Sequence, residues 1–291
     1  MLDAETLESF DHVIWLGSGH GAAAALNRSQ SSINRHTREV QRLFALGLKR
    51  IDGDWHLQGD ASLLLLEREV HQRFRLRRGQ RLRLEAAYWW RHSLDPCPPQ
   101  GWCTGRYDLA GPRRPVQLLK ERVIDAWIYA DPDLPDHDPE LVVLRFSDAA
   151  IQLITDPRHP LQQQGALQLD DTSAFPTLAL PDELLPEAAK AFRALGLWST
   201  PSRMARYQFD RWEGLCEDAV TIGYGFGLSL EVQPALRPLA LALPMRTSDA
   251  LILRRDVADQ LAFGLLLRDL QRRTAHHAVG HLDYQLIDGP D

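Results

Sequence analysis

The chain has 291 residues, a length that fits two or three domains, and 44% of the residues are hydrophobic, which is ample for well-formed cores. Its formal charge is -6, so the molecule as a whole does not attract nucleic acid or anionic membranes. A nucleic-acid contact would therefore need a local basic patch, and residues 28–50 contain six lysines and arginines against a single glutamate.

Several features of the sequence predict a cytoplasmic protein without a membrane partner. The three cysteines are an odd number and form no C-x-x-C pair, so we expect no structural disulfides. The N-terminus, MLDAETLESFD, is acidic and does not resemble a signal peptide. No apolar run reaches the roughly 18 residues that a membrane-spanning helix needs.

The glycines in DHVIWLGSGHGAAAAL allow two interpretations. As a G-x-G-x-x-A turn after a strand, Gly17, Gly19 and Ala22 would bind the pyrophosphate of a dinucleotide. That interpretation requires a preceding strand, but the apolar residues in 2–16 recur mainly every three or four positions, which predicts a helix. It also requires a buried strand before Glu39, which SQSSINRHTR cannot form. Both tests argue against a dinucleotide site.

The following segments predict a helix-turn-helix and a hairpin. Residues 29–44 show a helical pattern with Ser29 as N-cap, after a small, alanine-rich helix in GAAAALNR. One face of the longer helix is apolar, and the other carries polar side chains of the kind that bind base edges and phosphates in a major groove. Asp52 and Gly53 predict a hairpin turn between two short strands. Three helices and a hairpin are typical of a winged helix-turn-helix.

This N-terminal stretch resembles the DNA-binding domain of the LysR-type transcriptional regulators. The family pattern is close to L-x-x-F-x-x-V-x-x-x-G-S-F-x-x-A-A-x-x-L-x-x-S-Q-x-x-[VIL]-S-R-x-I-x-x-L-E. The residues that match it, without a gap, are Leu7, Phe10, Val13, Gly17, Ser18, Ala22, Ala23, Leu26, Ser29, Gln30, Ile33, Arg35 and Val40. The resemblance implies that double-stranded DNA is a partner of this chain.

The resemblance and the side-chain chemistry together indicate which residues contact DNA. Those expected at base edges are Gln30, Ser31, Asn34 and Arg35. Those expected at phosphates are Ser18, Arg28, His36, Arg38 and Lys49.

After the hairpin, Leu63, Leu66, Val70 and Phe74 recur at helical spacing, which in isolation is typical of a core helix. In this position the segment resembles the family's linker helix, through which two subunits pair. The resemblance therefore implies self-association, as a homodimer or a homotetramer. From about residue 80 strands alternate with helices, as in a parallel sheet. This order resembles the family's effector domain, which has two α/β lobes and is folded like a periplasmic binding protein.

The expected fold is thus α/β with an N-terminal all-α winged helix-turn-helix. The expected organisation is a winged helix-turn-helix DNA-binding domain in 1–58, a linker helix in 59–79, lobe 1 in 80–143 and 246–275, lobe 2 in 144–245, and a C-terminal tail in 276–291.

The first lobe departs from the family pattern after its first strand. RHSLDPCPPQGWCT contains Pro96, Pro98 and Pro99, so the full helix that is usual there cannot form. In the family the N-terminus of that helix borders the effector cleft, so the departure argues against an anion pocket at this point. The residues expected to contact a small-molecule effector are Trp90, His92, Ser93, Thr172, Ser173, Thr221, Gly223 and Tyr224.

No segment predicts an enzyme. His276, His277 and His281 have no cysteine or repeated carboxylate beside them to complete a metal site, and GYGFG lacks the lysine of a phosphate loop. We therefore expect no catalytic residue, no cofactor and no metal. The sequence predicts a LysR-like, sequence-specific DNA-binding transcriptional regulator that a small-molecule effector modulates. The alternative is a ligand-binding sensor module with weakened DNA binding that acts through protein partners.

Overall fold

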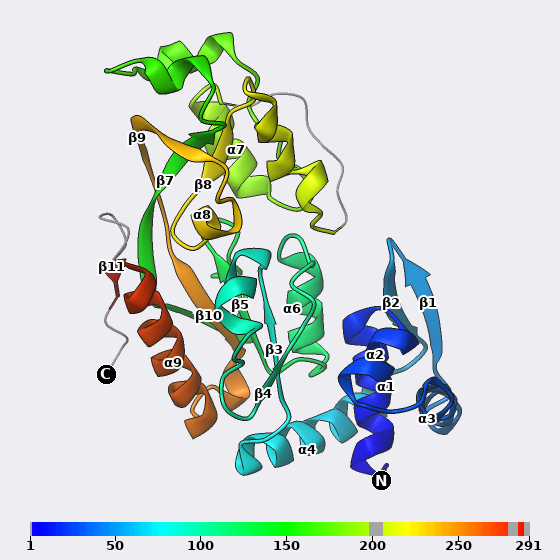
Figure 1. Ribbon diagram of the computed structural model, residues 1–291. Coiled ribbons are helices and arrows are strands. Elements are labelled where there is room, and N and C mark those ends of the chain that lie inside the picture. Colours follow the sequence, from blue (N-terminus) through cyan, green and yellow to red (C-terminus); the bar gives the residue numbers. More distant parts are fainter. Residues whose placement is uncertain (1, 198–205, 279–284, 288–291) are drawn as a thin grey trace.

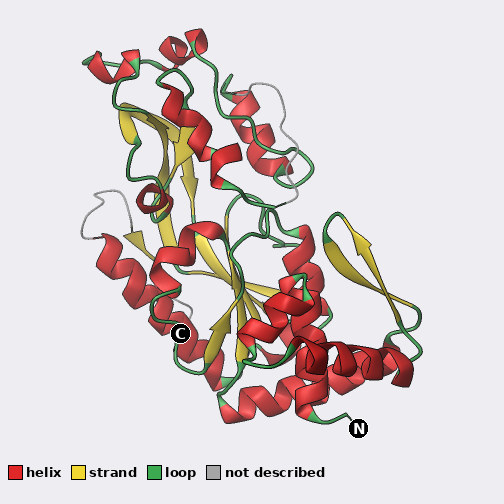
Figure 2. Cartoon of the chain, turned by 45° about the vertical axis from the view of Figure 1, so that its right-hand side comes forward, coloured by secondary structure: helices red, strands yellow, loops and turns green. Residues whose placement is uncertain are grey.

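The computed structural model describes residues 2–197, 206–278 and 285–287 (Figure 1). The N-terminal helices and a two-stranded hairpin lie at one edge of the molecule, beside the first of two α/β lobes. Figure 2 shows the sheets of the two lobes in yellow, one above the other, with helices around them. The expected order, an all-helical N-terminal part followed by two α/β lobes, is confirmed.

The first three helices begin and end at the residues that their capping chemistry favours. Helix α1 (Ala4–Leu16) ends at Gly17, which adopts the left-handed conformation with φ 71. Helices α2 (Gly19–Ala25) and α3 (Gln30–Leu43) are capped by the side chains of Ser18 and Ser29. Because a helix and not a strand precedes Gly17, the residues before the glycines lack the strand that a dinucleotide site requires.

Small side chains bring α2 and α3 close together. Ala22 and Ala23 are buried with Val13 of α1 and Ile33 of α3 in a compact apolar cluster. The hairpin follows, with β1 (Gly47–Ile51) and β2 (Asp54–Gln58) paired antiparallel and Ile51 opposite Asp54. The two residues between the strands both have positive φ, as the predicted tight turn requires.

Helix α4 (Ser62–Arg78) buries polar side chains and exposes apolar ones. Its inner face, Leu64, Arg68, Gln72 and Leu76, is buried. Its outer face carries Leu63, Leu66, Val70 and Phe74, which are 67%, 61%, 53% and 49% exposed. The apolar stripe seen in the sequence is therefore not part of the core of this chain.

The sheet of lobe 1 has the strand order β4-β3-β5-β10-β6. The first three strands are parallel neighbours, whereas β10 runs antiparallel to β5 and β6. The strands are β3 (Leu82–Ala86), β4 (Trp102–Thr104), β5 (Ala126–Ala130), β6 (Leu141–Arg145) and β10 (Asp249–Arg254). Helices α6 (Arg113–Lys120) and α9 (Leu261–Ala278) lie on either side of this sheet in Figure 1.

The sheet of lobe 2 is built around β7 (Ser147–Thr155). This strand pairs antiparallel with β8 (Gly223–Gly225), β9 (Arg237–Thr247) and the short β11 (Gln285–Leu286). Helices α7 (Pro186–Ala194) and α8 (Ser229–Val232) belong to the same lobe. The chain passes between the lobes twice, from β6 to β7 and from β9 to β10, and each passage takes a single residue.

Two segments, the one after β3 and the one at the end of the chain, have structures that the simple alternation of strands and helices does not describe. As the prolines indicate, no full helix follows β3, which is succeeded by a 3-10 turn (Tyr88–Trp90) and the four-residue α5 (Arg91–Leu94). At the other end, α9 continues to Ala278, so His276 and His277 lie in a helix and not in a tail, whereas His281 lies outside the described residues. None of the described helices is long and apolar enough to cross a membrane.

Buried charges join α1 to lobe 1. Asp11 accepts hydrogen bonds from Arg68 of α4 at 2.9 Å and from Arg83 of β3 at 2.8 Å. Burial alone would raise the pKa of Asp11, but the two guanidinium groups outweigh it and hold this pKa below its usual range. One turn further on, Trp15 donates its indole N–H to Glu85 at 2.5 Å. The N-terminal helices therefore share one core with lobe 1.

Glu85 should make the protein less stable as the pH rises. Burial raises its pKa from 4.5 to about 7, although the bond from Trp15 opposes this. Between these two values the folded protein binds more protons than the unfolded chain, so stability falls with rising pH. We predict that Glu85→Gln reduces the loss of unfolding free energy between pH 5 and pH 8 by up to about 3 kcal/mol. Urea unfolding at pH 5 and pH 8 measures it.

The exposed carboxylate Asp170 provides the control for this experiment, since Asp170→Asn should leave the pH dependence of stability unchanged. A Glu85→Gln protein whose stability changes with pH as steeply as that of the unmodified protein would contradict the prediction.

Candidate nucleic-acid interface and ligand pocket

Helix α3 lies at the edge of the molecule (Figure 1), and its exposed face is polar. Ser29 accepts a hydrogen bond from the amide of Ser32 at 3.2 Å and so defines the first turn of the helix. Ile33 and Val40 hold the opposite face against the core and are fully buried. The exposed side chains of the outer face are Gln30, Ser31, Asn34, Arg35, Arg38 and Arg42.

The positive charges of this surface are not neutralised by the protein itself. In the part of the chain that the structure describes, no ion pair involves Arg35, Arg38 or Arg42. The same holds for Lys49 and Arg50 of β1, which are exposed on the hairpin next to α3. A molecule of net charge -6 therefore presents a concentrated basic surface at one edge.

Three residues expected at phosphates have other roles in the structure. His36 is buried, and its Nδ1 lies 2.9 Å from the hydroxyl of Ser9, so its ring is turned into the core. Arg28 forms ion pairs with Glu5 and Glu8 at 3.4 and 3.5 Å, so its charge is already matched. Ser18 accepts a hydrogen bond from the amide of Gly21 at 2.9 Å as the cap of α2. Only the half-exposed Ser18 remains at the edge of the polar surface.

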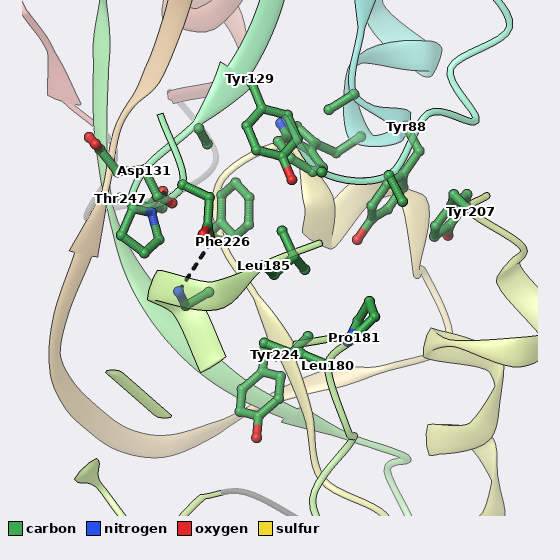
Figure 3. A pocket seen from close by; sticks show the side chains of 18 of the residues that line it. Tyr88, Tyr129, Asp131, Leu180, Pro181, Leu185, Tyr207, Tyr224, Phe226 and Thr247 are labelled. Carbon is green, nitrogen blue, oxygen red and sulfur yellow. Dashed lines mark hydrogen bonds between the residues drawn. The ribbon is translucent and has the colours of Figure 1, made fainter. Parts of the chain in front are cut away.

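A cavity of about 120 Å³ lies between the two lobes (Figure 3). Lobe 1 lines it with residues 87–89 and 129–133, which end or follow β3 and β5. These are neighbouring parallel strands, and their carboxyl ends are where open α/β sheets bind ligands. Lobe 2 contributes residues of α7 and β8. The aromatic lining residues are Tyr88, Trp89, Tyr129, Phe192, Tyr207, Trp212, Tyr224 and Phe226.

Aromatic contacts across the cavity connect the lobes. The rings of Tyr88 and Tyr207 stack with their centroids 3.6 Å apart and lie together on one side of the cavity in Figure 3. Trp89 meets Phe226 edge-on at 5.2 Å. Burial raises the pKa of Tyr224 to about 12, so this phenol stays uncharged at neutral pH.

Two carboxylates are the charged side chains among the described lining residues. Asp131 is held by Arg145, which donates to both its oxygens at 2.9 and 2.8 Å. Asp133 reaches across the cleft and accepts the amides of Glu187 and Ala188, at 2.9 and 3.1 Å, in the first turn of α7. Burial raises the pKa of Asp133, and these two N–H groups partly offset the shift.

Of the eight residues expected in an effector site, Tyr224 lines this cavity and the other seven do not. Trp90 is fully buried and donates its indole N–H to Asp249 at 3.0 Å. Strand β3 ends at Ala86 and a 3-10 turn follows, and its Trp89 lines the cavity while Trp90 does not. His92 is exposed, and Ser93 contacts Arg273 through its carbonyl.

The remaining expected residues lie elsewhere in lobe 2. Thr172 and Ser173 sit in a 3-10 helix and donate to the carbonyls of Leu169 and Asp170, at 2.6 and 2.7 Å. The hydroxyl of Thr221 donates to Asp218 at 2.7 Å, which closes a local turn. Gly223 packs so tightly that an added Cβ would lie 2.7 Å from Cys216 Sγ. These residues serve the structure of the lobe.

Sequence reasoning missed Tyr88, Tyr129, Asp133 and Tyr207 as pocket residues. The signal for the first three was their position at or just after the ends of two predicted strands, because ligands gather at the carboxyl ends of parallel strands. Nothing in the sequence indicated Tyr207. Among the described residues, no group of three or more His, Cys, Asp or Glu side chains could hold a metal ion.

Comparison with known proteins gives a match in fold. No protein-family model matches the chain. No curated protein matches it in sequence. Among solved structures, full-length OxyR from Pseudomonas aeruginosa has a TM-score of 0.55 at 10% identity, covering 97% of both chains. Full-length BenM has a TM-score of 0.51 at 18% identity, covering 96% of this chain and 98% of BenM.

CbnR, a LysR family transcriptional regulator, has a TM-score of 0.51 at 16% identity, covering 94% of this chain and 99% of CbnR. These matches extend over the N-terminal helices and both lobes together, so they compare the whole architecture and not one domain. The chain therefore has the fold of a full-length LysR-type regulator, with a winged helix-turn-helix and an effector domain like a periplasmic binding protein.

Proposed function

We propose that this chain is a cytoplasmic, sequence-specific DNA-binding transcriptional regulator whose activity a small molecule in the cleft between the lobes modulates. The observation that carries the proposal is the basic, unneutralised outer face of α3 beside the hairpin. Arginine can bind guanine, and glutamine or asparagine adenine, through paired hydrogen bonds. Gln30, Ser31, Asn34 and Arg35 then contact base edges, and Ser18, Arg38 and Lys49 contact phosphates.

Replacing Arg35 tests this assignment. Arg35→Ala should weaken binding to the preferred DNA site by about 1–3 kcal/mol and leave binding to random duplex nearly unchanged. Arg38→Ala should instead weaken both, and it should reduce the slope of log affinity against log salt by about 0.9. Fluorescence anisotropy against the duplex upstream of the chain's own coding sequence, or against genomic fragments selected by the protein, measures both effects.

Arg272→Ala is the matched control, because this exposed arginine lies on α9, away from α3. It should bind DNA like the unmodified protein. A protein that shows no preference for any genomic fragment over random duplex would refute the proposal and favour a sensor module that acts through protein partners.

We also propose that the exposed apolar stripe of α4 pairs with the same stripe of a second copy. The stripe consists of Leu63, Leu66, Val70 and Phe74, and the opposite face of α4 already packs against α1 and lobe 1. Large apolar side chains gathered on one exposed helix face usually mark an association surface. Such pairing would hold two copies of α3 at a fixed separation, as binding to a near-palindromic site requires.

Val70→Glu should therefore shift the protein toward the monomer, since it places a charge in the paired stripe. Analytical ultracentrifugation at micromolar concentration measures the shift, and circular dichroism should stay unchanged. Val220→Glu, at a valine of lobe 2 that is 45% exposed, should leave the association intact. Equal sedimentation of the Val70→Glu and unmodified proteins would contradict this pairing.

The segment 206–207 pairs with Asp108 and Leu109 of lobe 1, and its contact with the hairpin offers a route from the cleft to the proposed DNA-binding surface. Arg206 forms an ion pair with Asp54 at the start of β2, and its other nitrogen donates to Asp108 at 2.6 Å. The next residue, Tyr207, stacks on Tyr88 in the cleft. A ligand that separates these rings would move Arg206 relative to the hairpin.

This route predicts that substitutions of Tyr88 and of Arg206 disturb the same contact with the hairpin. Both Tyr88→Ala and Arg206→Gln should speed hydrogen exchange of the 47–58 hairpin by about tenfold, since each loosens one charged hydrogen bond. The double variant should add little to either change. Tyr224→Phe, at a cavity ring distant in sequence from Arg206, is the control. Strictly additive effects of the first two substitutions would exclude this connection.

A further inference from the structure

The cavity between the lobes is lined by rings and carboxylates, and no Lys, Arg or His is among its described lining residues. Eight of its lining residues are aromatic, and apolar residues such as Leu180, Pro181 and Leu185 lie beside them. A bound carboxylate or phosphate needs a cation or several free N–H donors to replace its hydration. The lining offers it no cation.

The N-terminus of α7, which could bind an anion, is already occupied. Helix α7 begins at the cavity, and its first-turn amides would suit a negative charge. Asp133 of lobe 1 accepts the amides of Glu187 and Ala188, so the chain's own carboxylate takes this place. The helix after β3, α5, spans four residues and provides no second terminus of this kind.

A cation is not favoured either, because both carboxylates of the lining have partners. Arg145 neutralises Asp131 with two hydrogen bonds, and the α7 amides hold Asp133. A cationic ligand would thus find aromatic faces but no unpaired negative charge. An uncharged ring avoids the desolvation cost of either ion and gains stacking against the aromatic wall.

We propose that the cleft binds an uncharged, flat aromatic molecule of about one ring. The size follows from the volume of about 120 Å³, which is close to the roughly 150 Å³ of an apolar cavity that accepts benzene. The proposal rests on the proposed function only in calling this molecule an effector. Binding itself depends on the lining alone.

Three probes of nearly equal shape separate the possibilities, namely uncharged benzamide, cationic benzamidine and anionic benzoate. Ligand-observed NMR at millimolar probe with the full-length chain, without DNA, gives their affinities. We expect benzamide to bind at least tenfold more tightly than benzoate and more tightly than benzamidine. Leu185→Trp, which fills the centre of the cavity, should abolish the benzamide signal and so assign it to this site.

Asp133→Asn tests the reason for the preference. By removing the negative charge at the α7 terminus, it should shift the affinity ratio severalfold toward benzoate. Asp148→Asn, at a carboxylate of β7 outside the lining, should leave the ratio unchanged. Tightest binding of benzoate or of benzamidine, or no binding of benzamide, would overturn the inference. Each of these results is independent of DNA binding, so a failure of the regulator proposal is recognised separately.

Discussion

The buried carboxylate of Asp11 holds the N-terminal helices on the rest of the molecule. It lies in α1 and accepts hydrogen bonds from Arg68 of α4 and Arg83 of β3, which are 57 and 72 residues further along the chain. Leaving one partner of a buried ion pair unmatched costs roughly 3–5 kcal/mol. A domain's whole stability is about 5–15 kcal/mol. The orientation of α3 at the edge of the molecule therefore depends on this cluster.

Elements fixed by local chemistry could be predicted from the sequence almost to the residue. The predicted cap Ser29 precedes the first residue of α3, and the predicted turn at 52–53 joins the strands of the hairpin. Each of these signals acts within a few residues of the chain, so no knowledge of distant partners is needed. The alternation of strands and helices from residue 80 indicated a parallel sheet, which describes β4, β3 and β5 but not the antiparallel sheet of lobe 2, and the two lobes came from the family resemblance.

Side-chain orientations that depend on distant partners could not be predicted. Arg28 and His36 have the residue types of phosphate contacts, but Glu8 and Ser9 of α1 hold them inward. In the cleft, a 3-10 turn follows β3, so Trp90 is buried and its neighbour Trp89 lines the cavity. Burial of a side chain depends on which elements pack against it, and periodicity along one element does not contain that information.

The same buried charges determine which parts of the molecule can respond to a ligand. Because α1 and lobe 1 share one core, the basic surface of α3 is joined to lobe 1. The cleft is lined by both lobes, so a ligand there acts on the position of lobe 2 relative to this joined body. Arg206 precedes Tyr207 of the cleft and forms an ion pair with Asp54 of the hairpin. Under the proposed function, a ligand that displaces Tyr207 therefore affects the hairpin first, and α3 keeps its place.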